Sequence, residues 1–133
     1  MTSSLNKALI IRFSSVGDIV LSSLLVRTLR TRFPACQIDF VVKEEFADLV
    51  RHNPYISNVI AFPRNGAWAD LQRLRTRIAH AAYDVILDIH DSLRSRYLCA
   101  GRRNVRRIKK RKLARFLLIT FKINMYERFG GAP

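Results

Sequence analysis

The sequence is poor in the residues that metal centres and disulfide frameworks require. Of its 133 residues two are cysteines, Cys36 and Cys99, and neither belongs to a C-x-x-C motif or lies beside a histidine cluster. We therefore expect no metal site, no disulfide framework and a reduced, cytoplasmic setting. Apolar runs are also short: the run Phe116–Phe121 is far below the roughly 20 residues that span a bilayer.

Acidic residues are scarce as well. Asp and Glu number 10 against 24 Lys and Arg, which gives a formal net charge of +14 at pH 7 and a pI near 11.1. Such a surface attracts anionic partners, among them nucleic acid, acidic lipid headgroups and phosphorylated sugars. Hydrophobic residues make up 49% of the chain, which indicates a globular domain with its own core and excludes a disordered chain.

The apolar pattern changes its period between residues 8 and 33. Ala8–Phe13 is a short apolar run and predicts a buried strand. Leucines then recur at intervals of three and four residues, which predicts an amphipathic helix over Ile19–Arg32. A strand followed by a short loop and a helix is the unit from which open α/β sheets are built.

The same alternation continues along the chain. Further strands are expected at Gln37–Val42, Val59–Phe62, Val85–Ile89 and Asn104–Val105, and further helices at Glu44–Arg51, Ala69–Ala82, after Asp91 or Ser92, and at Leu113–Phe121. We therefore predict one Rossmann-like α/β domain over residues 1–133, with a parallel sheet and helices on both of its faces.

The loop after the first strand holds the first candidate site. Ligands of open α/β sheets bind beyond the carboxyl ends of the strands, where Asp18 is expected. Asp18 is either a helix N-cap or a catalytic acid or base, and its spacing leaves both open. Ser14, Ser15 and Gly17 either form a tight turn or bind an acceptor or a phosphate. Because neither G-x-x-x-x-G-K-[ST] nor G-x-G-x-x-G is present, a nucleotide site is not favoured here.

The end of the fourth strand carries a second polar group. Asp88, His90 and Asp91 would face the same edge of the sheet as the first loop. Acid–base chemistry or metal binding is one interpretation, and hydrogen bonding that holds the strand end and its loop is the one we favour. The helix arginines Arg73, Arg75 and Arg77 form a second set, which we interpret as a solvated helix face.

The last part of the chain is basic. Residues 92–126 contain no acid and carry twelve of the 24 Lys and Arg residues. The run within 102–112 could bind acidic phospholipids, bind nucleic acid through its phosphates, or form a solvated loop. The residues expected at an anionic surface are Arg106, Arg107, Lys109, Lys110, Arg111 and Lys112. Scattered aromatic residues give no stacking platform, so a specific nucleic-acid partner is not expected.

Three blocks of the sequence resemble glycosyltransferase family 9, the heptosyltransferases. They read RFSSVGDIVLSSLLVRTLRTRFP, IDFVVKEEFADLVRHNPYISNVI and YDVILDIHDSLRSR, and the resemblance runs from Lys7 to about Tyr126. It implies that Asp18 is the catalytic base. The residues that it implies at the acceptor are Ser14, Ser15, Gly17, Arg64, His90, Arg94 and Arg96. The family's D-x-H-G-N-x-R-S-like block is altered here, because Asp91 and Ser92 stand where glycine and asparagine are common.

The resemblance also implies a function. The chain would be the N-terminal, acceptor-side half of a two-domain GT-B enzyme that transfers heptose from ADP-heptose to the lipopolysaccharide inner core, on Kdo–lipid A or a core heptose. The donor would bind in a C-terminal domain outside this chain, so no cofactor is expected here and the isolated chain is expected to be inactive.

The expected partners follow from the same interpretation. They are an anionic lipid-linked sugar acceptor, the inner leaflet of the inner membrane, to which the protein would bind peripherally, and a second copy bound through the exposed interdomain face. The alternative from another class is a non-catalytic basic α/β module that binds nucleic acid or an acidic membrane surface. That alternative explains the charge and leaves the S-S-x-G-D loop unexplained.

Overall fold

The computed structural model describes residues 5–108, 112 and 115, and five parallel strands form its sheet. The strands are β1 (Lys7–Ile11), β2 (Gln37–Lys43), β3 (Asn58–Phe62), β4 (Val85–Asp88) and β5 (Val105–Arg107). Their order in the sheet is β3-β2-β1-β4-β5. Lys7 lies opposite Gln37, and Ala8 lies opposite Val85, so β1 is the central strand.

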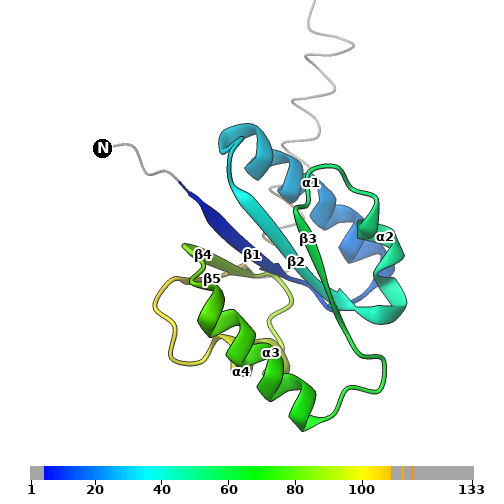
Figure 1. Ribbon diagram of the computed structural model, residues 1–133. Coiled ribbons are helices and arrows are strands. Elements are labelled where there is room, and N and C mark those ends of the chain that lie inside the picture. The colour runs from blue at the N-terminus through cyan, green and yellow to red at the C-terminus, as the bar shows by residue number, and fades with distance from the viewer. Residues whose placement is uncertain (1–4, 109–111, 113–114, 116–133) are drawn as a thin grey trace, which may run out of the picture.

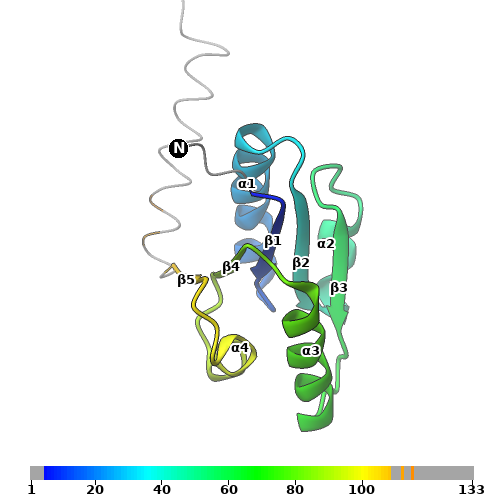
Figure 2. The same cartoon turned by 60° about the vertical axis from the view of Figure 1, so that its left-hand side comes forward.

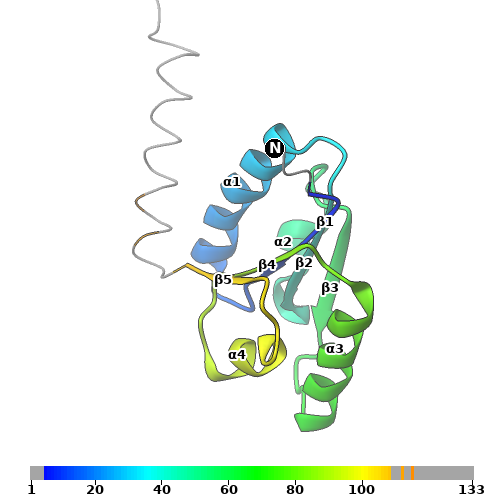
Figure 3. The same ribbon diagram turned by 90° about the vertical axis from the view of Figure 1, so that its left-hand side faces the viewer.

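In the residues that the structure describes, four α-helices cover the two faces of this sheet. They are α1 (Val16–Arg32), α2 (Asp48–Arg51), which follows the 3-10 turn η1 (Glu44–Phe46), α3 (Trp68–Ala81) and α4 (Leu93–Cys99). Helices α1 and α2 lie on one side of the sheet, and α3 and α4 lie on the other (Figure 1). Helices α3 and α4 pack against each other and lie side by side in Figures 2 and 3.

The core is divided by the sheet into two layers. Alternate residues of β1 point to opposite faces, so Ala8 and Ile10 pack toward α1 while Leu9 and Ile11 pack toward α3 and α4. All four of these side chains are completely buried. A central parallel strand is covered on both faces, and for this reason it reads as an apolar run without alternation.

The parallel arrangement brings the ends of four strands to one edge. The loops after Ile11, Lys43, Phe62 and Asp88 all leave this edge, which we call the carboxyl edge. The predicted Rossmann-like α/β fold, with a parallel sheet and helices on both faces, is confirmed. In the described part of the chain, no helix is both long and apolar enough to cross a bilayer.

Several boundaries differ from the sequence-based expectation, and the helix expected over Glu44–Arg51 is the turn η1 followed by α2. Helix α1 begins at Val16, three residues before the expected Ile19, because the serines and glycine of the loop dilute the apolar pattern of its first turn. Strand β5 covers Val105–Arg107 and is displaced from the expected 104–105. The helix expected over 113–121 lies outside the described residues, apart from Arg115, which is exposed.

Candidate functional site

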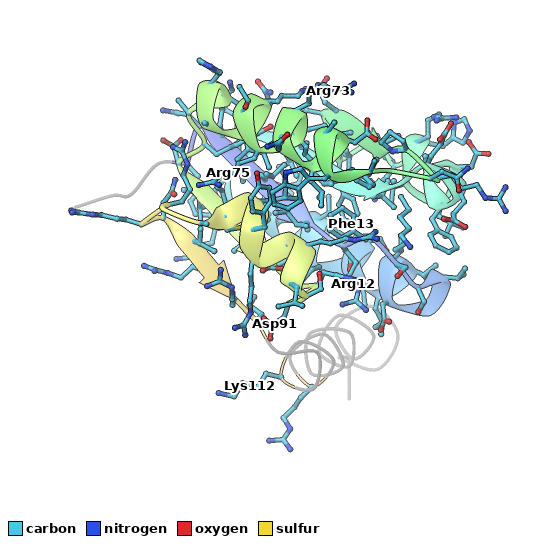
Figure 4. All side chains as sticks on the ribbon, turned by 90° about the horizontal axis from the view of Figure 1, so that it is seen from below. Arg12, Phe13, Arg73, Arg75, Asp91 and Lys112 are labelled. Carbon is cyan, nitrogen blue, oxygen red and sulfur yellow. The ribbon has the colours of Figure 1, made fainter. Side chains whose placement is uncertain are left out.

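Arg12 is a buried charge at the centre of the carboxyl edge. It follows β1 directly and is 6% exposed. Its Nη1 donates to the backbone carbonyl of Ile89 at 2.7 Å, and its Nη2 lies 2.5 Å from Oδ2 of Asp18. Viewed toward the carboxyl edge, Arg12 lies between α1 and α4 (Figure 4). The guanidinium therefore joins the loop after β1 to the loop after β4.

Asp18 lies in the first turn of α1 and is held from two sides. Its Oδ2 pairs with Arg12 and accepts a hydrogen bond from the hydroxyl of Ser15 at 3.0 Å. The Asp18 side chain is 15% exposed, so the carboxylate is oriented yet still reaches solvent. The N-cap position belongs to Ser15, and the interpretation of Asp18 as the N-cap is therefore wrong. Both the helix N-terminus and Arg12 favour a negative charge at this place.

The loop beside Asp18 leaves open space. Ser15 and Gly17 are exposed and Ser14 is half-buried. Beyond its chain neighbours and the nearby backbone of its own helix, a Cβ atom built on Gly17 would meet no described atom within 4 Å, and Gly17 has helical backbone within α1. Neither a close internal contact nor a left-handed turn therefore requires the glycine, and the tight-turn interpretation of Gly17 is not supported. The first turn of α1 can be approached closely from outside.

Asp88 holds the loop that follows β4. Its side chain is completely buried, and Oδ1 accepts the backbone N–H groups of His90 at 3.2 Å and Asp91 at 2.9 Å. Its Oδ2 lies 3.4 Å from Nε of Arg107. This is the strand-end arrangement that we favoured for the second polar group. No group of three or more metal-ligating side chains comes together in the described ranges.

His90 lies beside the first loop. Its ring meets the ring of Phe13 edge-on, with centroids 5.2 Å apart. Burial and then the charge of Arg12 lower the pKa of His90, while Asp88 and the Ser14 carbonyl oppose that shift. His90 is therefore neutral at neutral pH, and its Nδ1 is buried without a hydrogen-bond partner among the described residues.

The backbone of the loop after His90 accommodates the two altered residues, Asp91 and Ser92. Asp91 adopts φ 51°, in the left-handed region where glycine is favoured and which Asp tolerates better than most residues. Ser92 is the N-cap of α4, and its hydroxyl accepts the backbone N–H of Ser95 at 3.2 Å. Asp91 in turn accepts from Nε of Arg96 at 2.9 Å. The two substitutions are therefore accommodated by a left-handed aspartate and a serine cap.

The predicted anion-binding residues fall into three groups. Arg64, Arg94 and Arg106 are exposed, and Arg64 lies at the carboxyl edge, where its backbone N–H donates to Glu44 at 3.2 Å. Arg96 and Arg107 pair with Asp91 and Asp88 and so help to hold the site's own loops. Lys112 is exposed. The remaining residues of the basic run, Lys109, Lys110 and Arg111, lie outside the described residues.

The two cysteines take no part in this site. Both are free and buried. Burial raises the pKa of both thiols, to about 11 for Cys99. Because the thiolate is the nucleophile, neither cysteine is an activated nucleophile at neutral pH.

Arg12 is the residue of this site that the sequence analysis did not single out. The one signal for it is a basic residue placed directly after an apolar strand and before the S-S-x-G-D loop. One partner, Asp18, is close in sequence, whereas the other, Ile89, is 77 residues away. A local pattern therefore cannot reveal the contact with Ile89.

Fold and site together define a Rossmann-like α/β domain with an ion-paired aspartate at the carboxyl end of its central strand. No family model matches the sequence. Lipopolysaccharide heptosyltransferase 1 of Pseudomonas aeruginosa is 27% identical over 104 residues, which cover 69% of this chain and 28% of that protein.

Two solved structures share the fold. E. coli ADP-heptose lps heptosyltransferase II has a TM-score of 0.63 and 27% identity, over 83% of this chain and 32% of that chain. A glycosyl transferase family 9 protein from Veillonella parvula has a TM-score of 0.66 and 22% identity, over 74% of this chain and 30% of that chain.

The chain is thus a heptosyltransferase-like domain, similar in sequence and fold to glycosyltransferase family 9. The resemblance predicted from the sequence is confirmed. The chain spans about 30% of the length of the proteins that it matches.

Proposed function

We propose that the chain is the acceptor-binding part of a glycosyltransferase that moves heptose from ADP-heptose to the lipopolysaccharide inner core, on Kdo–lipid A or a core heptose. Asp18 is the proposed catalytic base. The observation that carries this proposal is the Asp18 carboxylate, which Arg12 and Ser15 orient at the carboxyl edge. The similarity to heptosyltransferases supports the choice of sugar.

The proposed chemistry is an inverting sugar transfer. Asp18 removes the proton from the acceptor hydroxyl as that oxygen attacks the anomeric carbon, and the bond from this carbon to the donor phosphate breaks. The nucleoside diphosphate leaves with the bonding electron pair. Arg12 favours the ionised form of Asp18, which the proton transfer requires. The donor is assigned to a domain outside this chain.

The acceptor is proposed to lie over the first turn of α1. Ser14, Ser15 and the open side of Gly17 contact its sugar, and His90 lies beside this loop, against Phe13. The exposed guanidinium of Arg64 suits the carboxylates and phosphates of the core saccharide, as does that of Arg94. Arg96 is already paired with Asp91 and contributes through that loop. The protein would act at the cytoplasmic side of the inner membrane.

The test is Asp18→Asn in a protein that holds this chain together with a donor-binding domain. Turnover is expected to fall by about 10²–10⁴-fold, the range of general base catalysis, while acceptor binding persists. Asp48→Asn is the matched control, since Asp48 is an exposed acid of α2 that pairs with Arg51. Near-normal turnover of a folded Asp18→Asn protein would sink the assignment.

The net charge of +14 favours a second candidate, a non-catalytic module for nucleic acid or an acidic membrane surface. Binding to any DNA duplex, with an affinity that falls steeply with salt, would support the nucleic-acid form of it. Selective binding of the phosphorylated lipid-linked saccharide would support the transferase.

A further inference from the structure

The two most exposed large apolar side chains of the described residues lie around one tyrosine. Leu93 is 88% exposed and Trp68 is 58% exposed. The Trp68 ring packs at a tilt against the ring of Tyr97 with centroids 4.5 Å apart, and Leu93 precedes Tyr97 by one turn of α4. We call this the aromatic surface, and it consists of Trp68, Arg75, Leu93, Arg94 and Tyr97.

Positive charge borders the aromatic surface. The Arg75 guanidinium lies 4.9 Å from the centre of the Tyr97 ring, and Arg94 is an exposed residue three positions before Tyr97 on the same side of α4. The nearby acids are neutralised, because Asp70 pairs with Arg73 and Asp91 pairs with Arg96. The net charge around the aromatic surface is therefore positive.

Core packing does not account for these exposed side chains. The hydrophobic cluster on this face of the sheet includes Leu71, Leu74 and Leu98, which fill the contact between the two helices and the sheet. Trp68 and Leu93 lie outside that buried cluster. Large apolar groups held together in water usually mark a surface that binds something.

The chemistry of the surface favours a lipid bilayer. An aliphatic side chain exposed as far as Leu93 gains from contact with hydrocarbon and offers a sugar no hydrogen bond. Trp and Tyr suit the boundary between hydrocarbon and water. Arginines beside them attract anionic headgroups, at about a fivefold gain in binding for each such residue.

We propose that the aromatic surface docks this chain on an anionic lipid bilayer. Leu93, Trp68 and Tyr97 enter the headgroup boundary, while Arg75 and Arg94 contact anionic headgroups. The surface begins at the N-termini of α3 and α4, which follow the carboxyl edge where Asp18 also lies, so docking would present this edge to a lipid-linked acceptor. The inference rests on the proposed function only for this link to the acceptor.

Trp68 makes the test direct, because it is the chain's one tryptophan. The full chain is mixed with vesicles of phosphatidylglycerol and phosphatidylethanolamine, and in parallel with phosphatidylcholine vesicles. A blue shift of the emission is expected with the anionic vesicles only. Lipids brominated near the headgroup end of their acyl chains should quench that emission.

Matched variants test the residues by vesicle sedimentation. Leu93→Ser is expected to weaken binding about tenfold and Arg94→Gln about fivefold. The controls are Leu49→Ser and Arg27→Gln, an exposed leucine and an exposed arginine of α2 and α1 on the other face of the sheet. Both controls should bind as the unaltered chain does.

Several results would overturn the proposal. One is sedimentation with an unshifted Trp68 emission, which would assign membrane binding to another surface such as the run 106–112. Another is a shift caused by soluble phosphorylated saccharide in the absence of vesicles, or by raising the protein concentration. None of these vesicle experiments measures sugar transfer. The role of Asp18 is therefore decided separately, by the turnover of Asp18→Asn.

Discussion

The two ends of the sheet are built differently. At the amino end, the buried carboxylate of Asp39 accepts hydrogen bonds from the Tyr83 hydroxyl at 2.5 Å, from the Asn58 amide at 2.9 Å and from the Gln37 amide. The carboxylate of Asp84 accepts the backbone N–H groups that begin β1. Every buried side-chain polar atom described at this end has a hydrogen-bond partner.

The carboxyl end leaves buried polar atoms without hydrogen bonds. In the described part of the chain there are three such side-chain atoms, Arg12 Nε, Asp88 Oδ2 and His90 Nδ1, and all three lie here. Asp88 Oδ2 does lie within ion-pair distance of Arg107, at 3.4 Å, but makes no hydrogen bond.

The difference between the two ends of the sheet distinguishes polar groups that stabilise the fold from polar groups that serve function. Buried polar groups are normally satisfied, so a group of exceptions at one end calls for a reason beyond folding. Both ends belong to the same strands, so the topology does not impose the difference. It coincides instead with the end where ligands of open α/β sheets bind, and with the proposed base Asp18.

The largest predicted loss of stability is at the amino end. Asp39→Ala removes the shared acceptor of three donors and is expected to lower the free energy of unfolding by about 3 kcal/mol. Tyr83→Phe should cost about 1 kcal/mol, because it removes a single donor. Urea unfolding measures both. A loss below 1 kcal/mol for Asp39→Ala would mean that the hydrogen bonds at the amino end stabilise the fold no more than the polar contacts at the carboxyl end do.

At the carboxyl end, Arg12→Met removes the buried guanidinium that pairs with Asp18 and is expected to cost about 2 kcal/mol. The double variant Arg12→Met with Asp18→Leu should cost less than Arg12→Met does, because apolar groups of similar size replace a desolvated pair without penalty. Unfolding of the single and double variants in urea gives the coupling energy. If the double variant were less stable than Arg12→Met, the ion pair between Arg12 and Asp18 would serve to stabilise the fold.

Substitution of Asp91, the residue with left-handed backbone in the loop after β4, is expected to change stability less. Asp91→Ala is expected to cost about 1 kcal/mol, because alanine resists φ 51°. Asp91→Gly should leave stability within about 0.5 kcal/mol, since glycine adopts this conformation freely. Thermal unfolding of the two variants separates backbone strain from the loss of the Arg96 pair, which both share. Equal losses of stability in the two variants would show that the lost ion pair with Arg96, and not backbone strain, causes the effect.

The smallest effect is the pH dependence of His90. Its folded-state pKa lies below the value of about 6.5 in the unfolded chain, mainly because of burial, so the unfolded state binds more protons below that pH. Stability should therefore fall as the pH drops from about 6.5. His90→Gln should flatten this part of the profile, whereas the exposed His80→Gln should not. Thermal midpoints between about pH 5 and 7.5 test this, and identical profiles for the unaltered chain and His90→Gln would contradict it.

The sequence predicted the elements better than the contacts. The central strands were predictable because burial on both faces leaves an uninterrupted apolar run. Asp18 was predictable as a candidate because it follows such a run across a loop of small residues. The start of α1 was missed because Ser15, Val16 and Gly17 are weak helix formers whose place is decided by the fold.

The ion pairs could not be predicted from the sequence, for a different reason. Arg107 reads as part of a basic run, yet strand pairing places Arg107 directly opposite Asp88 across β4 and β5. The contact between the rings of Trp68 and Tyr97 likewise depends on how α3 and α4 meet. Contacts between distant segments follow from the packing of elements, and no local periodicity encodes them.

The central position of β1 has a consequence for synthesis on the ribosome. All four strand pairs of the described sheet are parallel, so none of its strands can close as a hairpin with the next strand in the chain. Ile89, the backbone partner of Arg12, is made 77 residues later. At ordinary elongation rates the interval is about 4–15 s. Until β4 is made, β1, which is apolar on both faces, can pair with β2 alone.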